Sequence, residues 1–174
     1  MMRTEDSPML ARPSALGAWW GLPIWLALSA LAGGIASAVT VPQIPGWYAG
    51  LVKPSFTPPD WVFGPVWTAL YVMMALAVWL VCRVPLSAGG AARGMAVALY
   101  LVQLALNCLW SILFFKLHQI EAAAIDITLL LVAVAATALA FYPLHRLSGW
   151  LLMPYLIWVG YAGGLSWSIW ATNP

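Results

Sequence analysis

Charged side chains are scarce in this chain. Asp, Glu, Lys and Arg make up 7% of its 174 residues, whereas soluble domains carry about 25%. Hydrophobic residues make up 64% of the chain, so a soluble globule of this composition would expose too much apolar surface to stay dissolved. The shortage of charge therefore excludes an ordinary soluble fold and indicates a membrane protein.

Side chains that bind metals, attack substrates or contact nucleic acid are also few. Cys82 and Cys108 fall in apolar segments without C-x-x-C spacing, so they read as small buried hydrophobes. His118 and His145 have no carboxylate or cysteine at the spacing of metal ligands. The seven basic residues are scattered, which argues against a nucleic-acid partner. We expect no metal site, no catalytic constellation and no obligatory cofactor.

Long apolar runs are what the chain has in abundance. Crossing a hydrocarbon core of roughly 30 Å takes a helix of about 20 residues, and five apolar segments approach or exceed that length: 17–40, 61–82, 94–115, 121–142 and 149–171. These segments lack the alternation of apolar and polar residues that is typical of the strands of membrane β-barrels, so helices are expected. The predicted fold is an all-α integral membrane protein. A mobile tail, 1–16, precedes a single domain, 17–174, that is a bundle of five transmembrane helices.

The first apolar segment has two possible interpretations. Arg3 and Arg12 precede it and Ala36-Ser37-Ala38 resembles a cleavage site, as in a signal peptide. Its apolar length exceeds the 7–15 residues of a signal-peptide core, which favours a retained helix. On the amino-terminal side of the membrane lie Arg3, Arg12, Arg83, Arg93 and Arg146, against Lys53 and Lys116 on the other side. This bias predicts a cytoplasmic amino terminus, with the carboxyl terminus on the opposite face.

A proline-rich connection separates the first two predicted helices. Pro54, Pro58 and Pro59 each fix φ near −65° and push the preceding residue toward extended geometry. We therefore expect residues 53–59 to form a stiff, non-helical lid segment. Asp60 is expected to cap a helix that begins near Trp61.

Aromatic and amide side chains share one face on each of three predicted helices. The faces comprise Phe63, Trp67, Tyr71 and Met74; then Gln103, Asn107, Trp110 and Phe114; then Tyr155, Trp158, Ala162 and Ser166. Such faces fit either a cavity for a flat apolar ligand or a tightly packed core, and periodicity does not choose between them. The first helix carries small residues, Ala27, Ala30, Gly33, Gly34, Ser37 and Ala38, which helix packing mostly explains. Asp126 is expected to serve as a cap or in an interhelical hydrogen bond.

Three separated motifs give the chain a specific resemblance. They are W-Y-x-x-L-x-K-P with P-P-x-W-x-F-x-P-x-W-T-x-L-Y, from Trp47 to Tyr71, then QLALNCLWSILFF, from Gln103 to Phe115, and PYLIW, from Pro154 to Trp158. In this order they resemble the translocator protein family, also called tryptophan-rich sensory or peripheral benzodiazepine receptor proteins (TspO/MBR). The resemblance covers roughly Ala30 to Pro174 and implies a five-helix bundle in a bacterial cell membrane, usually a homodimer.

The resemblance also implies a ligand and its site. Family members bind protoporphyrin IX, haem-like tetrapyrroles and synthetic isoquinoline carboxamides or benzodiazepines. Trp67, Asn107 and Trp158 match cavity positions of the family, while Trp47, Pro54 and Trp61 match the lid. With the shared faces, the predicted ligand-binding set is Trp47, Trp61, Trp67, Tyr71, Gln103, Asn107, Trp110, Tyr155, Trp158, Ala162 and Ser166. The end of the chain, after Tyr161, lacks the basic residue of the animal sterol motif, which argues against specific cholesterol binding.

The function expected from this resemblance is porphyrin binding for sensing, sequestration or transport in a lipid membrane. One alternative is light-dependent degradation of protoporphyrin through the indoles of Trp67 and Trp158. Another is a small-molecule or lipid transporter, although the five segments show neither an inverted repeat nor paired interrupted helices.

Overall fold

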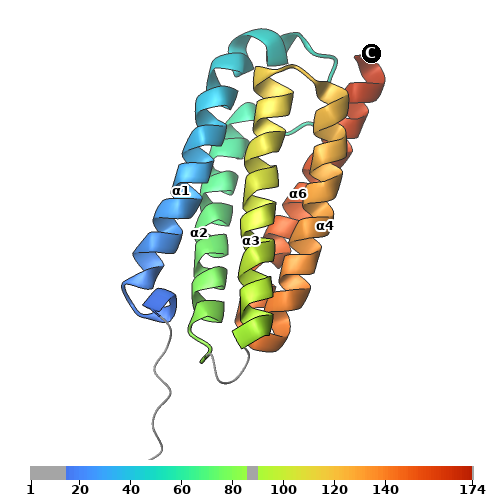
Figure 1. Ribbon diagram of the computed structural model, residues 1–174. Helices are drawn as coiled ribbons and strands as arrows, with labels where there is room; N and C mark the ends of the chain where they lie inside the picture. Colours follow the sequence, from blue (N-terminus) through green and yellow to red (C-terminus); the bar gives the residue numbers. More distant parts are fainter. Residues whose placement is uncertain (1–14, 86–89, 174) are drawn as a thin grey trace, which may run out of the picture.

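The protein is a bundle of long helices joined by short connections (Figure 1). The computed structural model describes residues 15–85 and 90–173, which contain helices and no strand. The long helices are α1 (Gly21–Thr40), α2 (Phe63–Cys82), α3 (Gly90–Ser111), α4 (Ile120–Leu144) and α6 (Met153–Thr172). The expected mobile tail, 1–16, lies outside the described residues, apart from the two that begin the 3₁₀-helix η1 (Ala15–Gly17). The predicted all-helical class is confirmed.

Four helical stretches are long and apolar enough to cross a bilayer. They are Gly21–Tyr48, Asp60–Cys82, Gly90–Lys116 and Ile120–Leu144. Of the predicted fifth segment, 149–171, the first residues fall in a separate short helix, α5 (Arg146–Leu151), and the rest form α6. Pro154 stands in the opening turn of α6, where its missing N–H leaves no helical bond unmade. The protein is thus an integral membrane protein with four or more apolar spans.

The first helix extends further than predicted. Beyond Thr40 the chain continues through a 3₁₀ turn, η2 (Val41–Gln43), and a π-helical turn, η3 (Ile44–Tyr48). Pro42 and Pro45 each occupy the opening of their own turn, so the helix changes its hydrogen-bond register instead of ending. Trp47, which the resemblance assigns to the lid, therefore lies on a helical turn.

The lid segment, 53–59, is non-helical as predicted. The Thr57 hydroxyl donates to the Pro54 carbonyl at 2.7 Å, which closes a turn within the segment. Just before the segment, the Val52 amide donates to Asn173 Oδ1 at 2.9 Å. The lid segment and the carboxyl terminus therefore meet at one end of the bundle, called here the lid end (Figure 1).

The start of α2 differs from the prediction. The 3₁₀-helix η4 (Asp60–Val62) precedes α2, and no side chain caps it. The Val62 amide donates instead to the Pro59 carbonyl at 3.0 Å. A capping hydrogen bond from Asp60 was expected, and this part of the prediction is wrong because a backbone carbonyl takes that amide.

Helices α1 and α2 pack closely at the end opposite the lid and separate toward it. The buried residues of α1 stop at Ala32, and those of α2 start at Leu70. At Gly33 a Cβ atom would stand 2.7 Å from the Tyr71 ring, so only glycine permits this approach. Beyond this point neither helix buries a residue on its way to the lid end. The fold therefore leaves space between the two helices in the lid half.

Adjacent glycines on α1 provide a matched test of this close approach. We expect Gly33→Ala to lower the free energy of unfolding by about 1–3 kcal/mol, because the added methyl group overpacks against Tyr71. Gly34→Ala is the control, since a Cβ there meets nothing within 4 Å and alanine favours a helix. Thermal unfolding in detergent measures both variants, and equal melting temperatures would contradict the packing described.

Candidate functional site

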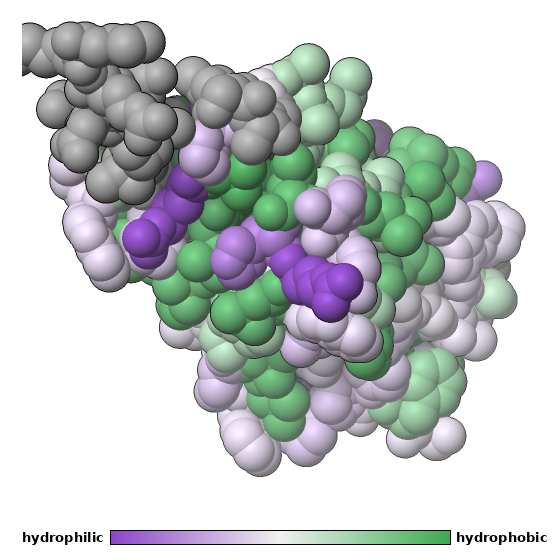
Figure 2. All heavy atoms as spheres, turned by 90° about the horizontal axis from the view of Figure 1, so that it is seen from below, coloured by the Kyte–Doolittle hydropathy of each residue, from purple (hydrophilic) through white to green (hydrophobic). Residues whose placement is uncertain are grey.

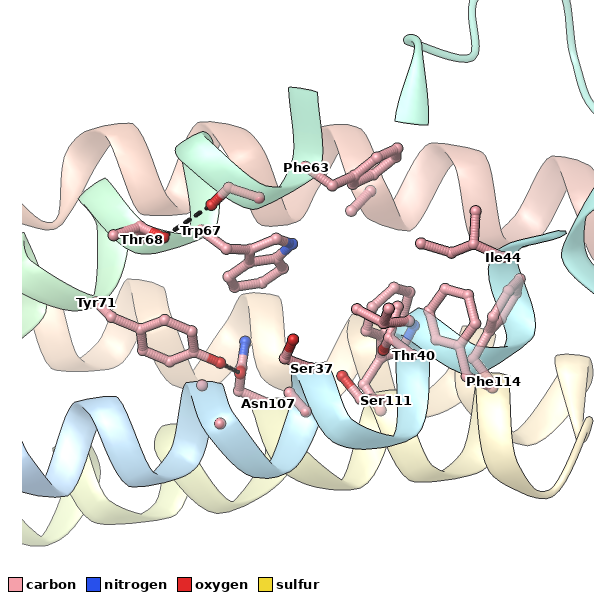
Figure 3. A pocket seen from close by; sticks show the side chains of 18 of the residues that line it. Ser37, Thr40, Ile44, Phe63, Trp67, Thr68, Tyr71, Asn107, Ser111 and Phe114 are labelled. Carbon is pink, nitrogen blue, oxygen red and sulfur yellow. Dashed lines mark hydrogen bonds between the residues drawn. The ribbon is translucent and has the colours of Figure 1, made fainter. Parts of the chain in front are cut away.

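A cavity of about 690 Å³ occupies the lid half of the bundle. Residues of α1, α2, α3 and α6 line it, together with the helical turns that follow α1 and α3 (Figure 3). Its volume falls within the range of about 300–1,000 Å³ that is usual for small-molecule sites. The space exists because α1 and α2 separate above Gly33 and Tyr71.

Aromatic rings form much of the cavity wall. The ring-bearing residues are Tyr48, Trp61, Phe63, Trp67, Tyr71, Trp110, Phe114 and Phe115. From α1 the small residues Ala30, Gly33, Gly34 and Ser37 line the cavity, with Ser37 across from Trp67 (Figure 3). A cavity lined by rings and small side chains suits a broad, flat, apolar molecule, which gains stacking area from the rings and meets little steric obstruction from the small residues.

A short chain of buried polar groups lies at the inner end of the cavity. The Tyr71 hydroxyl donates to Asn107 Oδ1, and Asn107 Nδ2 donates to the Tyr155 hydroxyl at 3.1 Å. Tyr155 is completely buried and Asn107 nearly so. This chain, called here the Tyr71–Asn107–Tyr155 link, satisfies each group inside an apolar bundle and joins α2, α3 and α6.

The lid end of the cavity is closed by a helical turn fastened to the neighbouring loop. The Trp47 ring on η3 stacks on the His118 ring, with centroids 4.1 Å apart and planes 14° from parallel. His118 holds a positive φ of 56° in the loop between η6 (Ile112–Lys116) and α4, a conformation that His tolerates better than most residues. Trp47 also meets Phe114 edge-on at 5.3 Å. These contacts position Tyr48, next to Trp47, against the cavity.

The cavity also reaches the outer surface between α1 and α2. Lining residues that are exposed on this side are Ala30, Gly34 and Ser37 of α1, and Gly64, Thr68 and Val72 of α2. Trp61, at the lid end of this opening, is 74% exposed. Since both helices are long and apolar enough to span a bilayer, we expect the opening to face the hydrocarbon region.

Seven of the eleven predicted ligand-binding residues line the cavity, whereas the other four and the three lid prolines do not. Those that line the cavity are Trp61, Trp67, Tyr71, Asn107, Trp110, Ala162 and Ser166. Those that do not are Trp47, Gln103, Tyr155, Trp158, Pro54, Pro58 and Pro59. Gln103 lies one helical turn from Asn107, away from the lid end, and its Nε2 donates to Met74 Sδ at 3.7 Å. Trp158 packs behind the wall, edge-on to Phe63 at 5.8 Å.

Sequence reasoning missed part of the cavity. The small residues of α1 were attributed mostly to helix packing, yet Ala30, Gly33, Gly34 and Ser37 line the space. Their signal was present in the sequence, but small residues look the same whether a helix or a ligand approaches them. Tyr48 was not predicted to line the cavity, because the helical extension of α1 through η3 was not foreseen.

Asp126 does not belong to the cavity wall. It is buried on α4, and its Oδ2 has no hydrogen-bond partner among the described residues. The expected cap or interhelical hydrogen bond is therefore wrong for the described part of the chain. Within residues 15–85 and 90–173, no group of three or more His, Cys, Asp or Glu side chains is placed to hold a metal ion.

Comparison with known proteins identifies the family. The model of the TspO/MBR family matches residues 24–171. The chain belongs to the TspO/MBR family. The chain is 40% identical to the tryptophan-rich protein TspO of Chlorobaculum tepidum, over 83% of this chain and 90% of that protein. It is 42% identical to the translocator protein of Homo sapiens, over 73% of this chain and 75% of the human one. It is 39% identical to protein CrtK of Rhodobacter capsulatus, over 74% of this chain and 79% of that protein.

In this TspO/MBR protein, variants of two tyrosines can distinguish the role of the polar link in stability from its role in the cavity wall. Both hydroxyls bond to Asn107, but only Tyr71 lines the cavity. We expect Tyr71→Phe and Tyr155→Phe each to destabilise the fold by about 1–3 kcal/mol, because each leaves a buried amide atom unpaired. Only Tyr71→Phe should also change ligand affinity. Thermal unfolding and a porphyrin titration check this, and an affinity change confined to Tyr155→Phe would contradict the geometry.

Proposed function

We propose that the cavity binds porphyrins, such as protoporphyrin IX and haem-like tetrapyrroles, so that the protein senses, sequesters or moves them within the membrane. The observation that carries this proposal is the aromatic-walled cavity that opens between α1 and α2. A porphyrin is flat, apolar and broad, and it partitions into lipid. It therefore matches both the shape of the space and its access from hydrocarbon.

The cavity wall favours one arrangement of the macrocycle. Trp67 and Trp110 line the cavity from α2 and α3, and Ser37 of α1 lies across from Trp67 (Figure 3). The carboxylate groups of a porphyrin need a polar or cationic neighbour. At the lid end Lys53 donates to the Tyr48 carbonyl at 2.7 Å and lies over the Tyr48 ring. We therefore orient the carboxylates toward the lid end and the apolar edge toward the Tyr71–Asn107–Tyr155 link.

The name of one relative, translocator protein, agrees with the part of the proposal in which a molecule is moved. The rival role, light-dependent breakdown of protoporphyrin, needs an oxidisable ring beside the ligand. Trp67 meets this need, whereas Trp158 lies behind the wall. We place the amino terminus in the cytoplasm, with the lid end on the opposite face, from the distribution of Lys and Arg.

Replacing two tryptophans one at a time tests the proposal. Protoporphyrin IX should quench tryptophan fluorescence saturably, and Trp67→Ala should weaken its binding several-fold, because a stacked ring is worth about 0.5–1.5 kcal/mol beyond its buried area. Trp158→Ala removes an equal ring outside the cavity lining and should bind nearly as the native protein does.

Two results would reject this account of the site. One is unsaturable quenching equal to that of detergent micelles alone. The other is an equal loss of affinity in both variants when both remain helical and fold cooperatively. Running the titration in darkness and in light, and looking for a new absorbing product, separates binding from breakdown.

A further inference from the structure

The end of the bundle opposite the lid is positively charged. Arg83 follows α2, Arg93 lies in the first turns of α3, and Arg146 begins α5, so all three stand at this end. Asp60, Glu121 and Asp126, the acidic residues that the structure describes, lie in the lid half. Figure 2 looks onto this end and shows compact hydrophilic patches among hydrophobic side chains. No carboxylate of the described residues therefore neutralises the arginines.

Arg83 is held in an unusual position at this end. Its guanidinium carbon lies 4.9 Å from the ring centroids of both Trp19 and Trp79. Trp79 is buried, and its Nε1 donates to the Ala18 carbonyl at 3.1 Å, which fixes the ring. Two cation–π contacts hold the guanidinium group at this position, so less side-chain entropy remains to be lost when it binds an anion. Arg83 is exposed, and although its backbone amide donates to the Trp79 and Leu80 carbonyls, its guanidinium group donates no hydrogen bond to any described residue.

Arg93 adds a second positive charge beside the first. Its Nη1 donates to the carbonyl of Val84, next to Arg83 in the chain, at 2.7 Å. A weaker contact reaches the Cys82 carbonyl at 3.5 Å. Both guanidinium groups are thus held at the carboxyl end of α2, and none of the acidic residues that the structure describes lies there to pair with them. Arg146 stands at the same end but has no ring or hydrogen-bond contact of this kind among the described residues.

We propose that Arg83, held against the rings of Trp19 and Trp79, binds the phosphate of an anionic phospholipid, with Arg93 supplying the second charge. A guanidinium group matches a phosphate with two parallel N–H donors, and anionic headgroups gather at the basic face of a membrane protein. Trp19 is 75% exposed, which leaves an indole face at the headgroup level to lie along the lipid. This site is separate from the cavity and does not depend on what the cavity binds.

Lipid retention measured by native mass spectrometry tests this site. The full chain is purified from membranes, exchanged into mild detergent and offered equal amounts of phosphatidylglycerol and phosphatidylcholine. We expect preferential retention of phosphatidylglycerol, reduced at least about tenfold by Arg83→Gln, since one charge-assisted hydrogen-bonded pair is lost. Arg83→Lys should retain an intermediate amount of phosphatidylglycerol, because the positive charge remains while the planar guanidinium group with its parallel N–H donors is lost.

Arg146→Gln is the matched control, because it removes one positive charge from the same end without changing the contacts of Arg83 with Trp19 and Trp79. It should keep the preference, and both variants are checked for cooperative unfolding. The proposal is overturned if the native protein retains both lipids equally, or if Arg83→Gln and Arg146→Gln lose phosphatidylglycerol to the same extent. It is also overturned if soluble glycerol phosphate displaces the lipid at equal concentration, because the site would then bind phosphate and not a membrane lipid.

Discussion

The close approach of α1 to α2 at Gly33 and Tyr71 is the constraint on which the rest of the structure depends. A side chain at Gly33 would displace the Tyr71 ring. That ring is fixed because its hydroxyl donates to Asn107, which in turn donates to Tyr155. One missing Cβ thus lets α1 rest on α2 while the buried link holds α2 to α3 and α6. On the far side of this contact the helices pack tightly, and on the lid side they separate around the cavity.

The same arrangement supplies hydrogen-bond partners to the polar groups of Tyr71, Asn107 and Tyr155 inside an apolar bundle. In a bilayer a hydroxyl or amide without a partner costs several kcal/mol, so the link among Tyr71, Asn107 and Tyr155 stabilises the bundle only as a complete set. Its position at the inner end leaves the middle of the cavity mostly apolar and aromatic. At the opposite end η3, fastened by the stacking of Trp47 on His118, supplies Ile44 and Tyr48 to the cavity wall, and Val52 fastens the chain before the lid segment to Asn173.

Much of this could be predicted from the sequence, for identifiable reasons. Long apolar runs predict helices because lipid leaves few alternatives, and helical spacing correctly placed Phe63, Trp67 and Tyr71 on one face. The extension of α1 to Tyr48 could not be predicted, since Pro42 and Pro45 normally end a helix and the 3₁₀ and π turns that absorb them depend on packing. Trp158 shows a second limit. Periodicity places it on the inner face of α6, but it cannot show that Trp158 packs edge-on to Phe63 and that, of these two rings, only Phe63 lines the cavity.

The most direct measurement of the central claim is a crystal or cryo-EM structure of the protein saturated with protoporphyrin IX. The account predicts the macrocycle inside the cavity, stacked against Trp67, with its carboxylates toward Lys53 and the lid end. The Tyr71–Asn107–Tyr155 link should be intact beneath it. A macrocycle bound on the outer surface of the helices, with the cavity empty or filled by lipid, would contradict it.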